Sequence, residues 1–254
     1  MKKYAIIVAG GKGIRMSTEL PKQFIPINDK PLLMITLEAF CRYDNELELI
    51  VVLPVAQQEY WRTLCKQYGF SVSHRIANGG ETRFHSVKNG LMLIPDTEES
   101  LVAIHDGVRP FVSQKTISEA FKCAEKQGTA VPAINPVDSV RQLTGAVGAG
   151  LVPALAPNSA VGTGLVPALA PQSAALDRTT LKMVQTPQVF KSFLLKEAYL
   201  QEYTPSFTDD ASVVEKCGHP IILTEGNREN IKITTPLDLQ IAEAIANNNE
   251  QYEF

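Results

Sequence analysis

Residues 4–16 read YAIIVAGGKGIRM, an apolar run of strand length that passes directly into a glycine-rich loop. Apolar side chains at successive positions, without alternation, are typical of a strand buried on both faces, as in a parallel sheet covered by helices. The next segments agree, because residues 31–43 have helical spacing of apolar side chains and residues 49–53 form another apolar run of strand length. We therefore predict an α/β protein with one doubly wound, mostly parallel sheet.

The same alternation continues to the end of the chain. The last helix has the clearest start, with Thr235 as N-cap, Pro236 in the first turn and Asp238 three residues after the cap. Further strands are expected at 72–76, 101–105, 129–134, 221–224 and 231–233, and further helices at 56–68, 82–93, 113–127, 191–203 and 209–216.

Charge is distributed unevenly along the chain. The 24 Lys and Arg and 27 Asp and Glu give a formal net charge of −3, and none of them lies between Gln142 and Leu176. Without a basic cluster, we expect neither nucleic acid nor a membrane surface as a partner. Pro and Gly recur through the uncharged stretch and would break a membrane-spanning helix. The N-terminus lacks an apolar region of secretory length, so we expect a cytoplasmic protein.

The uncharged stretch contains a tandem repeat. Residues 146–159 read AVGAGLVPALAPNS and residues 160–173 read AVGTGLVPALAPQS. Two copies of a 14-residue unit are too few for a solenoid, which needs at least three repeats of about 20 residues or more. We expect a single domain over residues 1–254, with the repeat as a duplicated insert that forms a flexible or polyproline-like loop.

The loop after the first strand carries a candidate phosphate site. Glycines let backbone N–H groups approach a phosphate closely, and Arg15 and Lys22 would neutralise charge on a phosphoryl group in transfer. The competing interpretation is the dinucleotide site of a nicotinamide oxidoreductase, because Gly11-Lys12-Gly13 begins a GxGxxG pattern. Met16 occupies the third glycine position, which weakens that interpretation.

Asp106 is a candidate metal ligand at the end of an expected strand. The carboxyl ends of strands in open α/β sheets face the ligand crevice, and a carboxylate there can hold a Mg2+ ion that bridges phosphates. A cap of the following turn is the alternative role. Arg109 would either pair with Asp106 or meet a substrate phosphate, and His105 is expected to be structural.

A second glycine turn, Gly79-Gly80-Glu81-Thr82-Arg83, precedes an expected helix that contains Ser86. Its small and polar groups suit recognition of a base or a ribose. Capping of the helix explains the same residues equally well.

Several motifs together resemble one known family. In the order AGGKGIRM, PKQF, NGGETRFHSV, HDGVRPF, PVDSVRQ, DRTTLKMVQTPQVF, TDDASVVE and ENIKITTP, they are similar to the motifs of 2-C-methyl-D-erythritol 4-phosphate cytidylyltransferases. The resemblance implies a Rossmann-like nucleotidyltransferase fold. It also implies transfer of CMP from CTP to 2-C-methyl-D-erythritol 4-phosphate, with Mg2+ as cofactor and release of pyrophosphate, in the non-mevalonate isoprenoid pathway.

The resemblance also implies roles for individual residues. Arg15 and Lys22 would stabilise the transition state, Arg178 and Lys232 would position the acceptor phosphate, and Asp106 would hold Mg2+. The nucleotide would meet Ala9, Gly10, Gly11, Gly13, Gly80, Arg83 and Ser86, and the acceptor would meet Asp106, Arg109, Ser139 and Thr186.

The family uses the segment corresponding to about 135–183 as an arm that embraces a second subunit and carries the equivalent of Arg178. The resemblance therefore implies a homodimer, but the repeat at 146–173 lengthens the arm beyond the family's pattern. Two other functions remain open: a ribitol 5-phosphate cytidylyltransferase with the same fold and CTP motifs, and an inactive nucleotide-binding or assembly module.

Overall fold

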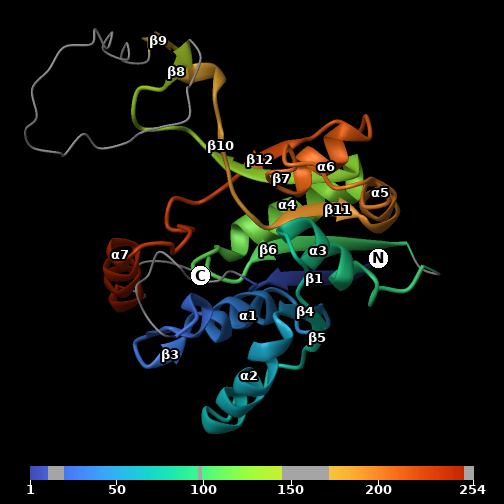
Figure 1. The fold of residues 1–254 in the computed structure, drawn as a ribbon, viewed down its shortest axis with the longest axis vertical. Coiled ribbons are helices and arrows are strands. Elements are labelled where there is room, and N and C mark those ends of the chain that lie inside the picture. The colour runs from blue at the N-terminus through green and yellow to red at the C-terminus, as the bar shows by residue number, and fades with distance from the viewer. Residues whose placement is uncertain (11–19, 97–98, 145–171, 249–254) are drawn as a thin grey trace, which may run out of the picture. The chain divides into compact units, whose positions relative to one another are not determined.

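The computed structural model describes residues 1–10, 20–96, 99–144 and 172–248, and the chain divides into two compact units (Figure 1). Unit 1 consists of Met1–Ile134 and Val184–Phe254, and unit 2 of Asn135–Met183. No helix among the described residues is long and apolar enough to cross a membrane.

Unit 1 contains the large sheet that the sequence predicts. Its strand order is β10-β7-β11-β6-β1-β4-β5, with β12 paired to β7. Pairing is parallel between β1 and β6, β1 and β4, β4 and β5, and β7 and β12, whereas β11 runs antiparallel to β6 and β7. The strands are β1 Lys2–Val8, β4 Glu48–Leu53, β5 Arg75–Asn78, β6 Ser100–Asp106, β7 Thr129–Ile134, β10 Met183–Val184, β11 Gln188–Lys191 and β12 Leu223–Glu225, and the first residue of β10, Met183, is the last residue of unit 2.

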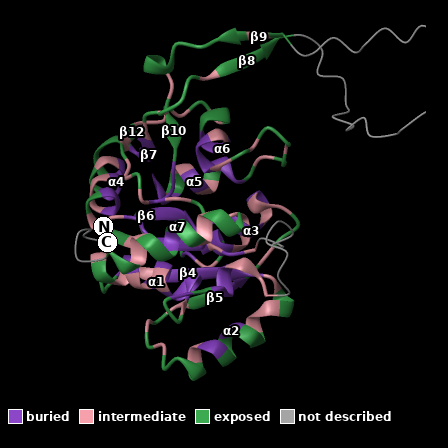
Figure 2. Cartoon of the chain, turned by 90° about the vertical axis from the view of Figure 1, so that its left-hand side faces the viewer, coloured by how far each residue is buried: buried purple, intermediate pink, exposed green. Residues whose placement is uncertain are grey.

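Helices cover both faces of this sheet, which confirms the predicted doubly wound α/β architecture. Alternate residues of β1 point into different cores: Ala5 and Ile7 pack with α1, α2 and α4, and Tyr4 and Ile6 pack with α3, α5 and α6. This two-sided burial explains the continuous apolar run in the sequence, and Figure 2 shows the buried strands between the helices. The helices are α1 Leu32–Tyr43, α2 Val55–Gln67, α3 Arg83–Leu91, α4 Gln114–Gln127, α5 Ser192–Ala198, α6 Asp210–Lys216 and α7 Pro236–Asn247.

The helix α7 begins as predicted, because Thr235 and Asp238 form a reciprocal capping box with Pro236 in the first turn. Three other local expectations were wrong. Residues 231–233 do not form a strand, because Ile233 N–H donates to the loop carbonyl of Val108 at 3.0 Å instead of joining a ladder. The third strand spans 75–78 rather than 72–76, and α5 ends at Ala198, well before residue 203.

The carboxyl ends of four parallel strands lie level. Val8 at the end of β1 pairs with Asp106 of β6 and Val52 of β4, and Leu53 pairs with Asn78 at the end of β5. The loops that follow these strands therefore start at one edge of the sheet, where ligands bind in open α/β folds.

Unit 2 contains a two-stranded antiparallel hairpin, in which β8 Arg141–Thr144 pairs with β9 Gln172–Ala175. The Arg141 guanidinium donates to the Ser173 hydroxyl and carbonyl, each at 2.8 Å. Most of the tandem repeat lies outside the described residues, but its last two residues, Gln172 and Ser173, begin β9.

Candidate active site

A cavity of about 630 Å³ lies at the carboxyl edge of the sheet in unit 1. It brings together several residues that the sequence predicted from separate motifs. These residues are Ala9, Gly10, Lys22, Gly80, Arg83, Ser86, Asp106 and Lys232.

Asp106 is the electrostatic centre of the cavity wall. Its Oδ2 lies 3.0 Å from Lys232 Nζ and 3.2 Å from Arg109 Nε, and its Oδ1 lies 3.6 Å from Arg83 Nε. Burial opposes ionisation of this carboxyl group, but the Arg83, Lys232 and Arg109 charges outweigh burial and hold its pKa well below the ordinary value. The Asp106 side chain is therefore an anion at neutral pH.

His105 and Thr186 hold the turn that carries Asp106. Burial lowers the pKa of His105 to about 4, so the ring is neutral and has one donor and one acceptor nitrogen. Its Nδ1 lies 3.0 Å from Thr186 Oγ1 and its Nε2 lies 3.0 Å from the Arg109 carbonyl oxygen. Because the Arg109 carbonyl can only accept, Nε2 carries the ring hydrogen, and Nδ1 accepts from the Thr186 hydroxyl, whose oxygen in turn accepts the Asp106 N–H at 3.1 Å. His105 thus has the structural role expected from the sequence, and contact of Thr186 with an acceptor stays a prediction.

Arg109 pairs with Asp106 in this structure, which was one of the two roles considered for it. Its Nη1 also donates to the Asn230 carbonyl at 2.8 Å, and this bond ties the segment before Lys232 to the turn after β6. A contact between Arg109 and a substrate phosphate stays a prediction.

The second glycine turn is fixed by Ser86. The Gly80 N–H donates to Ser86 Oγ at 3.0 Å, and that hydroxyl donates to the Thr82 carbonyl at 2.9 Å. A Cβ atom on Gly80 would collide with the His85 backbone and side chain, so the turn requires glycine. Thr82 also caps α3, which confirms the capping interpretation of this turn, and contact of Gly80 and Ser86 with the nucleotide stays a prediction.

The 3-10 turn Lys22–Phe24 carries Lys22 into the cavity wall. Gln23 Nε2 donates to Gln57 Oε1 of α2 at 2.6 Å. Phe24 is buried and stacks on Trp61, with ring centroids 6.0 Å apart. These contacts fix the backbone of Lys22 against α2. Gln57 was not predicted from the sequence, because no local pattern links it to residues 22–24.

The Arg83 guanidinium pairs with a carboxylate that was not predicted from the sequence. Its Nη1 and Nη2 lie 2.8 and 2.6 Å from Oδ1 and Oδ2 of Asp210. In the sequence, Asp210 is the second carboxylate of the pair Asp209-Asp210 before an expected helix. Because one carboxylate is enough to cap a helix, the surplus carboxylate was the only local signal for Asp210. A contact between Arg83 and the cytidine stays a prediction.

The remaining predicted site residues lie elsewhere in the chain. Gly11, Gly13 and Arg15 fall outside the described residues. Arg178 and Ser139 belong to unit 2, where both are exposed and Arg178 Nη1 donates to the Val137 carbonyl at 2.8 Å. Their contribution to the site stays a prediction.

The cavity has the donor chemistry for a metal that arrives with phosphates. Among the described residues no group of three or more His, Cys, Asp or Glu could hold a metal ion by itself. Asp106 does supply an ionised carboxylate beside Gly10 and Lys22. Mg2+ is commonly bound through one or two carboxylates and completed by substrate phosphates and water, so this site fits it.

A family model described as 2-C-methyl-D-erythritol 4-phosphate cytidylyltransferase matches residues 4–173 and 147–248 of the chain. The two matched ranges overlap across the tandem repeat. Relatives with the same name include proteins from Bacteroides fragilis, 52% identical over 96% of this chain and 100% of the relative, and Porphyromonas gingivalis, 43% identical over 96% and 97%.

Solved structures agree with the sequence matches. The 4-diphosphocytidyl-2C-methyl-D-erythritol synthase from Anaerococcus prevotii is 25% identical, with a TM-score of 0.74 over 97% of this chain and 96% of that chain. The 2-C-methyl-D-erythritol 4-phosphate cytidylyltransferase from Thermus thermophilus is 28% identical, with a TM-score of 0.68 over 97% and 100%. With this sequence similarity and this fold, the chain belongs to the 2-C-methyl-D-erythritol 4-phosphate cytidylyltransferase family.

Proposed function

We propose that this enzyme transfers the cytidylyl group of CTP to the phosphate of 2-C-methyl-D-erythritol 4-phosphate, a step of isoprenoid precursor biosynthesis. An oxygen of the acceptor phosphate bonds to the α-phosphorus of CTP, the bond from that phosphorus to the bridging oxygen of the β-phosphate breaks, and pyrophosphate leaves. Besides the family membership, the observation that carries the proposal is the ionised Asp106 in a cavity whose walls also carry Lys22, Arg83 and Lys232.

Catalysis of this kind rests on positioning and on stabilisation of phosphoryl charge. The acceptor phosphate is already an anion at neutral pH, so no side chain has to remove a proton from it. Accordingly His105, which is buried, neutral and bonded on both ring nitrogens, takes part only by shaping the Asp106 turn.

The proposed roles divide the site into three groups. Lys22, together with Arg15, neutralises charge on the transferring group, and Lys232, together with Arg178, orients the acceptor phosphate. Arg109, Ser139 and Thr186 complete the acceptor site. The nucleotide contacts the turns that contain Ala9, Gly10, Gly11, Gly13, Gly80, Arg83 and Ser86.

Asp106 is the proposed ligand for Mg2+. A bound Mg2+ supplies positive charge at the phosphates and fixes their orientation. Of the three cations that the described part of the chain places beside Asp106, Lys232 is the most exposed, with 43% of its side-chain area accessible, so it can withdraw to admit a metal.

The proposal extends to assembly and location. A homodimer formed through residues 135–183 follows from the family's use of this segment, and unit 2 spans that range. A cytoplasmic location suits an enzyme that uses CTP.

Pyrophosphate release by the purified enzyme tests the function. With CTP and Mg2+, release is expected with 2-C-methyl-D-erythritol 4-phosphate and not with ribitol 5-phosphate. Release with ribitol 5-phosphate alone would overturn the acceptor assignment, and release with neither acceptor would favour a binding module.

A further inference from the structure

The Arg83 side chain lies between two carboxylates, one in the cavity wall and one behind it. Both terminal nitrogens pair with Asp210, whereas Nε faces Asp106 Oδ1 at 3.6 Å. Asp210 is fully buried and is not among the described residues that line the cavity. We propose that Asp210 is a positioning residue: by holding the Arg83 guanidinium, it keeps the Asp106 carboxylate oriented and accessible to the metal and nucleotide.

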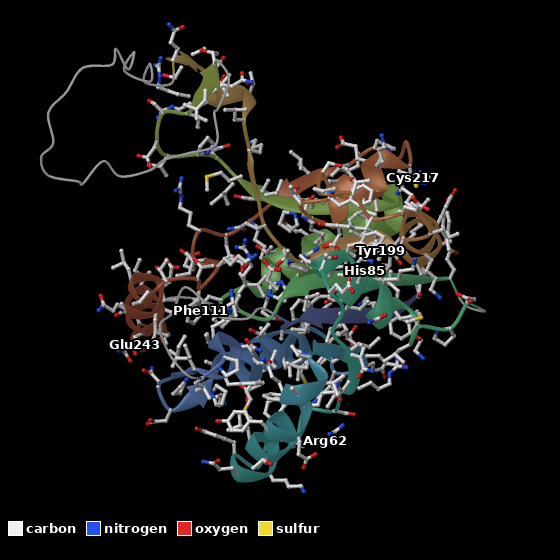
Figure 3. The ribbon with its side chains drawn as sticks, in the orientation of Figure 1. Arg62, His85, Phe111, Tyr199, Cys217 and Glu243 are labelled. Atoms are coloured by element: carbon white, nitrogen blue, oxygen red, sulfur yellow. The ribbon has the colours of Figure 1, made fainter. Side chains whose placement is uncertain are left out.

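Asp210 is itself held firmly. It is the first residue of α6, directly after the capping residue Asp209. The Tyr199 hydroxyl donates to Asp210 Oδ1 at 2.6 Å. The Tyr199 ring, labelled in Figure 3, stacks on Phe84 with centroids 4.6 Å apart. Burial and the Asp210 charge raise the pKa of Tyr199, so it remains a donor.

Geometry explains why the pairing matters to Asp106. A guanidinium presents its N–H groups as a planar fork that matches both oxygens of a carboxylate. Asp210 occupies the end of the fork formed by Nη1 and Nη2. Without that partner, the nearest carboxylate for the fork is Asp106, and a two-point pair there would engage both oxygens that a metal would use.

The charges around Asp106 also support this role of Asp210. Asp106 is faced by Arg83, Arg109 and Lys232, and Asp210 offsets the charge of Arg83. Loss of the Asp210 charge would leave the cavity wall more positive, which disfavours a divalent cation at Asp106.

The test uses Asp210→Asn, which keeps the shape of the side chain and removes its charge. Asp209→Asn is the matched control, because it makes the same chemical change one residue earlier. The Asp209 side chain caps α6 and accepts a hydrogen bond from Gln188. Tyr199→Phe removes the hydroxyl that donates to Asp210 Oδ1, which loosens the Asp210 carboxylate against Arg83 while both charges stay in place. Folding of each variant is checked by circular dichroism and thermal melting.

CTP binding is measured by isothermal titration calorimetry over a series of Mg2+ concentrations without acceptor, and kcat and KM are measured separately. Partners that orient metal ligands typically affect metal affinity about 10- to 100-fold. We expect Asp210→Asn to raise the Mg2+ concentration for half-maximal CTP binding by at least about ten-fold, Tyr199→Phe to raise it less, and Asp209→Asn to leave it unchanged.

A folded Asp210→Asn protein with an unchanged Mg2+ requirement would overturn the inference. If Asp210→Asn does not fold, an unchanged requirement in Tyr199→Phe would overturn it instead. The inference rests on the proposed role of Asp106, so Asp106→Asn is measured in parallel. An unchanged Mg2+ requirement in Asp106→Asn would overturn the proposed roles of both Asp106 and Asp210. A changed requirement in Asp106→Asn, with an unchanged one in Asp210→Asn, would overturn only the role of Asp210.

Discussion

Lys232 Nζ lies 3.0 Å from Asp106 Oδ2, and Ile233, the residue after Lys232, fixes this approach. Ile233 is fully buried against the cluster that contains Ile25, Leu32 and Phe111, and its N–H donates to the Val108 carbonyl. The salt bridge is therefore placed by the packing of the neighbouring residue rather than by a regular strand.

Ile233→Ala should destabilise the protein and displace Lys232. Truncation of a buried isoleucine typically costs about 2–5 kcal/mol of unfolding free energy. Urea denaturation measures this loss, and steady-state kinetics should show a higher KM for the acceptor phosphate. Ile241→Ala is the control, because Ile241 lies in α7 with 42% of its area exposed. Equal effects of the two substitutions would contradict the proposed role of Ile233.

Lys22→Ala should lower kcat by about 10²- to 10³-fold, the usual effect of removing one group that stabilises transition-state charge. The 3-10 turn should persist, because Gln23 and Phe24 anchor it to α2. Pyrophosphate release under saturating substrates and a thermal melt measure both properties. Lys66→Ala, on the exposed side of α2, should have normal turnover. Near-normal kcat in Lys22→Ala would remove Lys22 from the proposed mechanism.

Thr186→Val should weaken the turn that carries Asp106. The substitution keeps the size of the side chain but leaves the buried Asp106 N–H and His105 Nδ1 without their partner. An unsatisfied buried polar group costs about 1–3 kcal/mol, so we expect a loss of that order in the free energy of unfolding, together with a lower kcat. Thr63→Val in α2, where the residue is exposed, should change neither quantity. Wild-type stability in Thr186→Val would show that the turn is held by other contacts.

The order of strands and helices was predictable from the sequence because burial on both faces of the sheet leaves continuous apolar runs. Asp106 could be placed at the ligand edge because it ends such a run. The four-residue strand β11 was not predicted, since so short a segment has no clear periodicity. The pair between Arg83 and Asp210 could not be predicted either, because it joins residues that are 127 positions apart and only the folded chain brings them together.

The capping residue Asp238 should make the stability of α7 depend on pH. Burial opposes its ionisation, but the N–H groups of Thr234 and Thr235, each 2.8 Å from Oδ2, outweigh burial and lower its pKa. A lowered pKa in the folded state stabilises the protein above the unfolded-state pKa of about 3.9, and this stabilisation is lost as the pH falls through the folded-state value.

Asp238→Ala should therefore cost about 0.5–2 kcal/mol at pH 7, a typical effect of losing a helix cap, and less below pH 4. Urea denaturation at several pH values measures the difference. Glu243→Gln, on an exposed residue of α7 labelled in Figure 3, is the control and should show no such trend. A constant difference between Asp238→Ala and the wild type across this pH range would refute the linkage.

Deletion of one repeat copy, residues 160–173, should leave the enzyme folded and in the same assembly state as the full chain. The deletion joins Ser159 to Ala174, so Asn158 and Ser159 take the places of Gln172 and Ser173 at the start of β9. A serine then remains opposite Leu143, where Ser173 now accepts from Arg141. Because the free-energy cost of loop closure changes by only about 0.6 kcal/mol per doubling of loop length, the melting temperature should change little. Light scattering measures the assembly of the variant and of the full chain, and a smaller assembly of the variant would show that assembly requires both copies.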